Sequence, residues 1–182
     1  RKRCLDAGAS TGGFTDVLLR RNAGHVVAVD VGYGQLAWGL RPDERVTVLD
    51  RTNIRHLTGE MVGEPIDLVV ADLSFISLTL VLPALAAVSK PDADFVMMVK
   101  PQFEVGREKL GAGGVVRDPA LRKAAVIEVA DSAYDVGLGT MGITASPLPG
   151  PAGNVEYFLW LRRGAPEIDH AMLDQAIAIG PQ

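Results

Sequence analysis

The sequence is poor in cysteine and in long apolar runs. Its single cysteine, Cys4, excludes an internal disulfide framework and is typical of a protein of the reducing cytoplasm. No apolar run approaches the roughly 20 residues that a membrane-spanning helix needs, and no signal-peptide pattern is present. The three histidines, His25, His56 and His170, lack metal-ligand spacing. We therefore expect a globular cytoplasmic protein without a membrane segment or a metal centre.

The charge balance argues against one class of function. A formal net charge of −4 does not suit a protein that binds nucleic acid by bulk electrostatics. The segment from Lys100 to Lys123 departs from this balance, because it contains six basic and three acidic residues. This segment either contacts a polyanion or is a solvated loop whose charges are incidental.

The order of the expected elements indicates an α/β fold. Five short apolar runs have the character of buried parallel strands, and they fall at 3–7, 25–30, 45–49, 66–71 and 94–99. Helical patterns alternate with these runs, at 12–22, 32–40, 54–61, 77–88 and 118–137. Two late strands, 142–146 and 155–161, are joined by a hairpin-like connection, and a helix at 166–179 follows. We predict one Rossmann-like domain with a seven-stranded, mostly parallel sheet and one late antiparallel strand.

The segment Cys4–Phe14 has the composition of a ligand-binding turn. An apolar strand runs into a cluster of small residues and then into a helical pattern, which is where α/β sheets bind nucleotides. Its candidate cofactor-binding residues are Asp6, Gly8, Ser10, Gly12, Gly13 and Phe14. Ser10 replaces the second glycine of G-x-G-x-x-G, and no Gly-Lys-Ser/Thr follows, so neither dinucleotide fingerprint nor phosphate loop is present. The alternative is an ordinary strand-to-helix turn.

Charged side chains follow four of the expected strands, namely Asp30, Asp50, Asp72 and Lys100. Because the carboxyl ends of parallel strands meet at one edge of a sheet, we expect these side chains to line one crevice. Asp30 is placed to accept both ribose hydroxyls of an adenosine, and Asp50 to meet the adenine amino edge. A role in a turn or a helix cap is the alternative for Asp50.

Several segments together resemble one methyltransferase family. They are Leu5–Asp16, Val29–Gly32, Asp72–Ser77, Lys100–Gly106 and Gly153–Tyr157. The first is similar to motif I of S-adenosylmethionine-dependent methyltransferases. The whole set resembles the FtsJ-type ribose 2′-O-methyltransferases, and within them the TlyA branch, whose members are often labelled hemolysins. Asp72-Leu73-Ser74-Phe75 lacks the two prolines of the amino-methyltransferase motif, which favours a hydroxyl acceptor.

The resemblance implies a site and a reaction. It implies transfer of a methyl group from S-adenosylmethionine to a ribose 2′-hydroxyl of ribosomal RNA, 16S or 23S or both, with cytidine as the expected nucleotide. The last three members of the family's Lys-Asp-Lys-Glu tetrad fall on Asp72, Lys100 and Glu156. The cofactor is expected at the turn residues together with Asp30, Asp50 and Asp72. RNA phosphates are expected at Arg107, Lys109, Arg117, Arg122 and Lys123.

The family pattern also implies parts outside these residues. The first tetrad lysine belongs to a helix before the first strand, and an N-terminal RNA-binding domain precedes that helix. We expect this domain, ribosomal RNA and ribosomal subunits as partners, and a monomer. Two carboxylates near Lys100 would favour its charged form, so we expect Lys100 to orient the hydroxyl and stabilise the developing alkoxide. Phe75 either stacks on a base or on the adenine, or belongs to the core.

Two other interpretations remain open at this stage. A nicotinamide-dependent Rossmann enzyme would use the same sheet and the acid at Asp30, but it should carry G-x-G-x-x-G. A non-enzymatic module, membrane-lytic or RNA-binding, is suggested only by the hemolysin label of the relatives. A lytic module would need an amphipathic or membrane-spanning helix.

Overall fold

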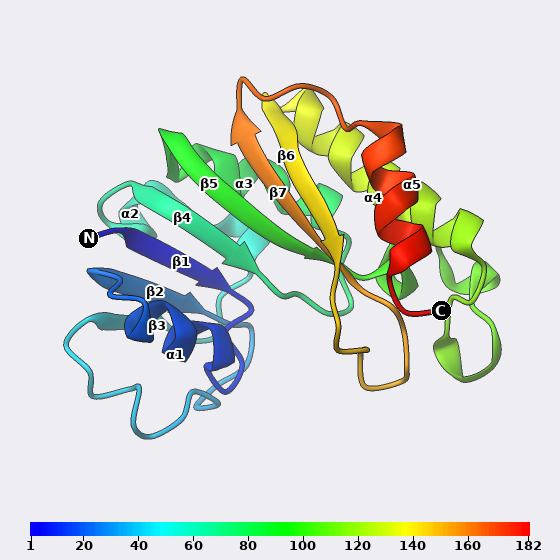
Figure 1. The fold of residues 1–182 in the computed structure, drawn as a ribbon. Helices are drawn as coiled ribbons and strands as arrows, with labels where there is room; N and C mark the ends of the chain where they lie inside the picture. Colours follow the sequence, from blue (N-terminus) through cyan, green and yellow to red (C-terminus); the bar gives the residue numbers. More distant parts are fainter. The chain divides into compact units, whose positions relative to one another are not determined.

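The computed structural model describes residues 1–182, and seven strands form its sheet. The strands are β1 (Arg3–Ala7), β2 (His25–Val29), β3 (Val46–Leu49), β4 (Ile66–Ala71), β5 (Ser89–Val99), β6 (Leu138–Ala145) and β7 (Tyr157–Arg163). Their order is β3-β2-β1-β4-β5-β7-β6 (Figure 1). The predicted seven-stranded α/β sheet is therefore confirmed. Contacts divide the chain into two compact units, a first unit of residues 1–73 and 81–95 and a second unit of 74–80 and 96–182.

The first unit is built on parallel strands. β1 pairs with β2 on one side and with β4 on the other, and β2 pairs with β3. Helix α1 (Gly13–Arg20) packs on β1 and β2 (Figure 1), where Leu19 is buried against Cys4 and Val26. This apolar contact anchors both sides of the turn that joins β1 to α1.

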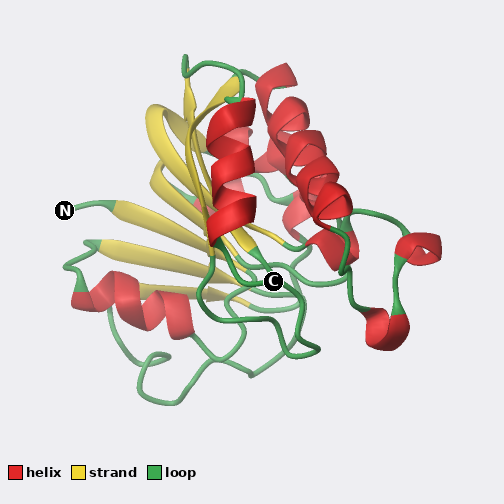
Figure 2. Ribbon diagram, turned by 45° about the vertical axis from the view of Figure 1, so that its right-hand side comes forward, coloured by secondary structure: helices red, strands yellow, loops and turns green.

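The helix predicted at 32–40 does not form. These residues make turns, and the whole connection from β2 to β3 is drawn as loop in Figure 2. Gly32, Gly34 and Gly39 make a helix costly, since each glycine loses about 1 kcal/mol relative to alanine in a helix. Leu36 is the buried residue of this stretch and packs against Ala9 and Ala28. Leu36, with Leu40 partly packed beside it, therefore anchors a glycine-rich loop.

Two other helical predictions hold only in part. The pattern at 54–61 divides into a 3-10 turn, η1 (Ile54–His56), and a short helix, α2 (Gly59–Val62). The pattern at 77–88 divides into η2 (Leu78–Leu80) and α3 (Leu82–Ala87). Strand β5 begins at Ser89, earlier than predicted, so Pro91 lies near the start of a strand, a position where proline is tolerated.

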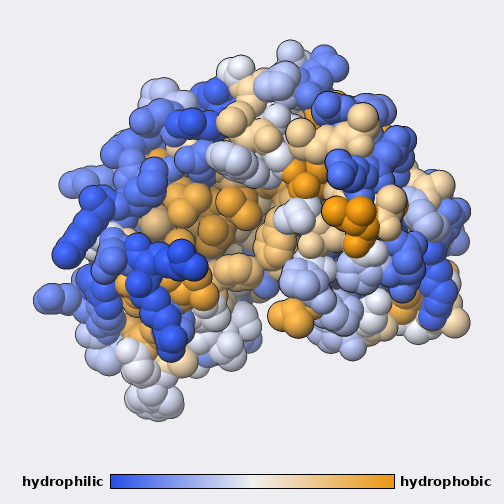
Figure 3. Space-filling model, viewed as in Figure 1, coloured by the Kyte–Doolittle hydropathy of each residue, from blue (hydrophilic) through white to orange (hydrophobic).

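One face of β4 is only partly covered. In Figure 3 apolar side chains are visible at the surface over β4. Leu68 and Val70 are half-buried, whereas Ile66 and Val69 have no exposed surface. Ile66 shares a face of the strand with Leu68 and Val70, so this face is fully packed at the start of β4 and half open further along.

The second unit confirms the late antiparallel strand. β7 runs antiparallel to β6, with a register irregularity between Thr140 and Gly142. Helices α4 (Pro119–Asp135) and α5 (His170–Ile179) lie side by side (Figures 1 and 2) and pack on β6. As predicted, Asp118 caps α4, and its carboxylate accepts the N–H of Ala120 at 2.9 Å.

The segment between β5 and α4 contains three 3-10 turns, η3 (Pro101–Phe103), η4 (Arg107–Lys109) and η5 (Ala112–Gly114). Buried Asn154 holds the end of this segment. Its Oδ1 accepts the N–H of Val116 at 2.8 Å, and its Nδ2 donates to the carbonyl of Gly114 at 3.0 Å. The buried side chain of Arg122 donates through Nε to the carbonyl of Val116 at 3.1 Å. The glycine-rich segment is therefore tied to the body of the unit at its C-terminal end.

Gly139 on β6 offers a test of the packing of this unit. A Cβ at Gly139 would lie 1.8 Å from the carbonyl oxygen of Ala165, whereas one at Gly142 would meet only the Trp160 ring at 3.6 Å. We expect Gly139→Ala to lower the free energy of unfolding by about 2 kcal/mol or more, because backbone must move. Gly142→Ala, on the same strand, should change it by less than about 0.5 kcal/mol. Urea unfolding measures both, and equal midpoints for the two variants would contradict this packing.

Candidate functional site

The turn between β1 and α1 is shaped by two backbone constraints. The N–H groups of Gly8 and Ala9 both donate to the carbonyl of Val29, at 2.9 and 3.0 Å. Gly8 has φ +82°, and a Cβ there would lie 2.2 Å from the carbonyl oxygen of Asp72. Only glycine meets both the conformation and the close approach. Ser10 has φ +50°, a left-handed conformation that a non-glycine residue rarely adopts.

Asp30 joins this turn to the loop that follows β2. One carboxylate oxygen accepts the N–H of Ser10 and the other accepts the N–H of Gly32, both at 2.8 Å. The N–H of Arg51, the second residue after β3, donates to the carbonyl of Gly32 at 2.9 Å. The structure therefore brings together the residues that follow β1, β2 and β3, as the sequence predicts for this edge of the sheet.

Asp50 lies in the same group of loops and has a partner that the sequence did not reveal. Its Oδ2 accepts from Nη2 of Arg41 at 2.8 Å and from the N–H of Gly34 at 3.3 Å. The hydrogen bond from the Arg41 guanidinium holds the pKa of Asp50 below its ordinary value. An adenine amino group would share this carboxylate with Arg41.

Asp6 does not face a ligand. It has no exposed surface, and one of its oxygens accepts the hydroxyl of Thr15 on α1 at 2.7 Å. Burial raises the pKa of Asp6 to about 6, an effect that the Thr15 hydroxyl partly offsets and the neighbouring Asp72 reinforces. The predicted direct contact of Asp6 with a cofactor is wrong, because its carboxyl group is buried and bonded to α1.

The open side of the turn lies at its second half. Gly12 has φ +102° and is buried under the side chains of Leu36 and Leu40. Gly13 is exposed, and a Cβ there would have no atom within 4 Å. Phe14 is half-buried in the first turn of α1. The free space above Gly13 is where a ligand can approach the start of the helix.

The first unit suits a nucleoside. Asp30 is a partly exposed acceptor at the carboxyl end of β2, the position where ribose hydroxyls bind in such sheets. Val31, next to it, is 71% exposed and offers apolar surface. The guanidinium of Arg51 lies over the ring of Tyr33, 4.4 Å from the ring centroid. Sequence reasoning missed Val31 and Tyr33, because an exposed apolar side chain has no signature in the pattern.

Asp72 comes directly after β4 in the first unit. Its N–H donates to the carbonyl of Ala7 at 2.9 Å, and its own carbonyl packs against Gly8. The backbone of Asp72 therefore belongs to the wall of the glycine turn.

In the second unit, Lys100 directly follows β5. Its Nζ donates to the hydroxyl of Ser74 at 3.2 Å. The next residue, Phe75, is 90% exposed and has φ +63°, and its ring centroid lies 5.0 Å from that of Phe103. The core alternative for Phe75 is therefore wrong. Ser74 could have been found from its place in the Asp-Leu-Ser-Phe segment, whereas the left-handed backbone at Phe75 could not.

Glu156 lies in a confined position in the same unit. It is 6% exposed and accepts from Nε2 of Gln102 at 2.9 Å. A Cβ on Gly150 would lie 2.8 Å from one of its carboxylate oxygens. Gln102 and Gly150 therefore fix the direction of the Glu156 carboxylate. No sequence pattern pointed to this role for either residue.

A second carboxylate, half-buried, lies near the end of η3. Glu104 accepts the hydroxyl of Ser77 at 2.5 Å and the N–H of Leu78 at 2.9 Å. Burial raises the pKa of Glu104, the two hydrogen bonds lower it in part, and the charge of Glu128 on α4 raises it further. These hydrogen bonds were not predicted, because Ser77 and Leu78 lie 27 and 26 residues before Glu104 in the sequence.

The five basic residues expected to contact RNA divide into two groups. Arg107, Lys109 and Arg117 are exposed on the segment between β5 and α4. Arg122 is 4% exposed and bonded to the backbone of Val116, so its predicted contact with phosphate is wrong. The reason is that α4 turns this residue towards the interior, which a count of charges cannot reveal.

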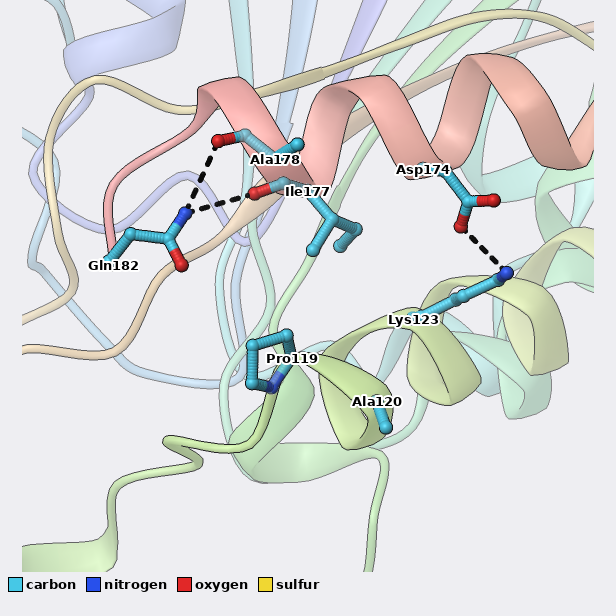
Figure 4. Close-up of a pocket in the computed structure, with 7 residues that line it drawn as sticks. All are labelled: Pro119, Ala120, Lys123, Asp174, Ile177, Ala178 and Gln182. Atoms are coloured by element: carbon cyan, nitrogen blue, oxygen red, sulfur yellow. Dashed lines mark hydrogen bonds and ion pairs between the residues drawn. The ribbon is translucent and has the colours of Figure 1, made fainter.

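Lys123 also has a partner within the unit. A cavity of about 360 Å³ lies between α4 and α5, and Figure 4 shows Lys123 reaching across it to Asp174 on α5 at 2.6 Å. Gln182 donates to the carbonyls of Ile177 and Ala178 at the end of α5. The polar groups of this cavity satisfy one another, and Lys123 contributes to helix packing.

Three further features bear on other kinds of site. No group of three or more His, Cys, Asp and Glu side chains is arranged to hold a metal ion. Cys4 is a free, buried thiol, and burial raises its pKa to about 11, which disfavours the reactive thiolate. None of the helices combines the length and the apolar character needed to cross a membrane.

The geometry defines a class, and comparison with known proteins defines it further. The sheet order and the turn after β1 are those of S-adenosylmethionine-dependent methyltransferases. The chain matches a Burkholderia thailandensis 1,6-didemethyltoxoflavin-N1-methyltransferase structure with bound S-adenosylhomocysteine, with a TM-score of 0.62 and 20% identity over 89% of this chain and 71% of that one. At this identity the match establishes the fold alone.

The family model for FtsJ-like methyltransferases matches residues 1–163, and the chain belongs to this family. It is 66% identical over 161 residues to the 16S/23S rRNA (cytidine-2′-O)-methyltransferase TlyA of Mycobacterium tuberculosis, and this match covers 88% of the chain and 60% of that relative. A Streptococcus thermophilus structure described as a candidate hemolysin matches with a TM-score of 0.92 and 39% identity, over 97% of this chain and 65% of that one. The predicted resemblance is confirmed.

The buried carboxyl of Asp6 predicts a pH-dependent stability. Its folded pKa, about 6, lies above the ordinary value of 3.8, so the stability it contributes is present below about pH 4 and is lost as the pH rises through about 6. We expect Asp6→Asn to match the wild type near pH 4 and to exceed its free energy of unfolding by up to about 3 kcal/mol at pH 7.5. Chemical denaturation at both pH values measures this difference.

The control for this prediction is Asp16→Asn, which changes a partly exposed aspartate of α1 that is paired with Arg20. This variant should gain no stability between pH 4 and pH 7.5. A difference between Asp6→Asn and the wild type that stays constant over this pH range would contradict the assignment.

Proposed function

We propose that this chain is the catalytic domain of an S-adenosylmethionine-dependent 2′-O-methyltransferase that acts on the ribose of ribosomal RNA. The observation that carries the proposal is the strand-end lysine Lys100, whose Nζ bonds Ser74 beside an exposed aromatic ring. The family model covers residues of both units, which supports treating 1–182 as one catalytic domain. The printed activity of the M. tuberculosis relative supports cytidine in 16S and 23S rRNA as the target.

The first unit would hold the cofactor. Asp30 would accept the ribose hydroxyls, Asp50 would accept the adenine amino group beside Arg41, and the space above Gly13 would admit the methionine part. Val31 would cover the adenine with apolar surface. When bound, S-adenosylmethionine supplies the electrophilic methyl group.

The second unit would hold the acceptor. An ammonium cannot accept a proton, so Lys100 would orient the ribose hydroxyl and stabilise the negative charge that develops on its oxygen. Glu156 would hold the ammonium, and Gln102 keeps the Glu156 carboxylate in one direction.

Exposed groups of the second unit suit RNA. Phe75 is exposed enough for a base to stack on it, a contact worth about 1–3 kcal/mol. Arg107, Lys109 and Arg117 are exposed cations that would meet phosphates. Because the formal net charge is −4, these contacts would position RNA locally rather than attract it over a distance. Ribosomal RNA within its subunits, in the cytoplasm, is the proposed partner.

Calorimetric titration tests the cofactor assignment. We expect the intact protein to bind S-adenosylmethionine and to show no binding of NAD. Gly13→Ala should leave the melting temperature unchanged, because a Cβ there meets no atom, and should weaken S-adenosylmethionine binding by about tenfold or more through steric exclusion. Binding of NAD in place of S-adenosylmethionine, or full affinity in Gly13→Ala, would contradict the proposal.

Lys100→Met tests the acceptor side. The methionine keeps much of the side-chain length and removes the charge, so we expect methyl transfer to ribosomal RNA to fall by about a hundredfold or more. Cofactor affinity should be unchanged. The control is Lys2→Met, which removes an exposed lysine near the start of the chain. Near-normal transfer in Lys100→Met with intact cofactor binding would rule out the assigned role.

A further inference from the structure

Two segments of the second unit meet beside Lys100. One is the segment 74–78, which carries Ser74 and Phe75, and the other is the segment 100–104, which ends in Glu104. Three contacts join them, and the first two are at the surface: the Lys100–Ser74 hydrogen bond at 3.2 Å and the tilted pair of Phe75 and Phe103 rings at 5.0 Å. Surface contacts of this kind are individually weak.

The third contact is of a different kind. The half-buried carboxylate of Glu104 receives the hydroxyl of Ser77 at 2.5 Å and the N–H of Leu78 at 2.9 Å. Hydrogen bonds to a charged acceptor are roughly twice as strong as those between neutral groups. The Ser77 hydroxyl also lies 2.7 Å from that of Thr79 and accepts the N–H of Thr79 at 3.2 Å. Glu104 is thus the strongest tie between the two segments.

The segment that Glu104 ties carries a conformation needing support. Phe75 has φ +63° and is 90% exposed, so its own side chain gains little burial to offset the backbone cost, which is of order 1–3 kcal/mol. Such a conformation persists only where neighbouring contacts determine it. Ser77 and Leu78 follow Phe75 by two and three positions. The bonds that Glu104 makes to them supply that constraint.

We propose that Glu104 is a positioning residue for methyl transfer, which fixes the segment 74–78 so that Ser74 meets the Lys100 ammonium and Phe75 presents its ring to the RNA. This inference rests on the proposed function and extends it to a residue outside the predicted set. Glu104 touches neither the cofactor nor the reacting atoms in this role. It acts through Ser77 and Leu78.

Three variants of the intact protein test the proposal. Glu104→Ala removes both hydrogen bonds. Glu104→Gln keeps the shape, and its amide can accept from Leu78 and donate to the Ser77 hydroxyl. Glu167→Ala, which changes an exposed glutamate of the same unit, is the matched control. Each variant is examined by amide hydrogen exchange of the segment 74–80, by S-adenosylmethionine binding, and by methyl transfer to ribosomal subunits.

In Glu104→Ala we expect the Leu78 amide to exchange about tenfold faster or more, because its charged acceptor is lost. Methyl transfer at saturating cofactor should fall by a similar factor, and cofactor affinity should be unchanged. Glu104→Gln should restore both exchange and transfer to within about threefold of the wild type. Glu167→Ala should resemble the wild type in all three measurements.

Several results would overturn the proposal. They are unchanged protection of Leu78 in Glu104→Ala, unchanged methyl transfer despite lost protection, and a Glu104→Gln variant as impaired as Glu104→Ala. A parallel loss of cofactor binding and melting temperature would indicate a merely structural role and overturn it as well. If the wild type transfers no methyl group, the proposed function fails and the role in transfer fails with it, while the exchange data separately establish whether Glu104 holds the segment.

Discussion

The carboxylate of Asp30 joins two turns at one edge of the sheet. It receives one N–H from the turn after β1 and one from the loop after β2. The first of these comes from Ser10, which holds a left-handed backbone conformation that costs free energy. The carboxylate supports the first turn together with the backbone hydrogen bonds to the carbonyl of Val29. Arg51 extends the arrangement to β3 through the carbonyl of Gly32, so one side chain organises three strand ends.

In the second unit two carboxylates also hold loops in place, one of them half-buried and the other buried. Glu104 ties the segment after β4 to the end of β5, and Glu156 is held by Gln102 and by the close approach of Gly150. Burying a carboxylate is costly unless hydrogen bonds replace the lost water. Apolar packing would hold these loops without the free-energy cost of removing a carboxylate from water. The structure therefore uses polar ties where the direction of a side chain matters more than stability.

The fold was predictable from the sequence where local signals agree with each other. The β-branched run before Asp30 and the apolar run before Asp72 predicted β2 and β4, because continuous apolar runs are typical of strands inside a parallel sheet. Asp118 followed by proline predicted the start of α4 for the same local reason. The helix predicted at 32–40 failed because a few apolar residues at helical spacing were outweighed by the three glycines between them. In this loop Leu36 is buried in the core, and Leu40 packs against it in part.

The sequence by itself determined the fold class, the family and the chemical types of the site residues, because strand periodicity, caps and motif spacing are encoded within short stretches. Only the tertiary structure decided which of these residues face outward. Asp6 is buried beneath the turn, and Arg122 is buried on the inner side of α4. Phe75 is exposed near Lys100. The tertiary structure also pairs Glu104 with Ser77 and Leu78, residues far from it in the chain. Burial and long-range pairing depend on how distant segments pack together, and no local pattern records that.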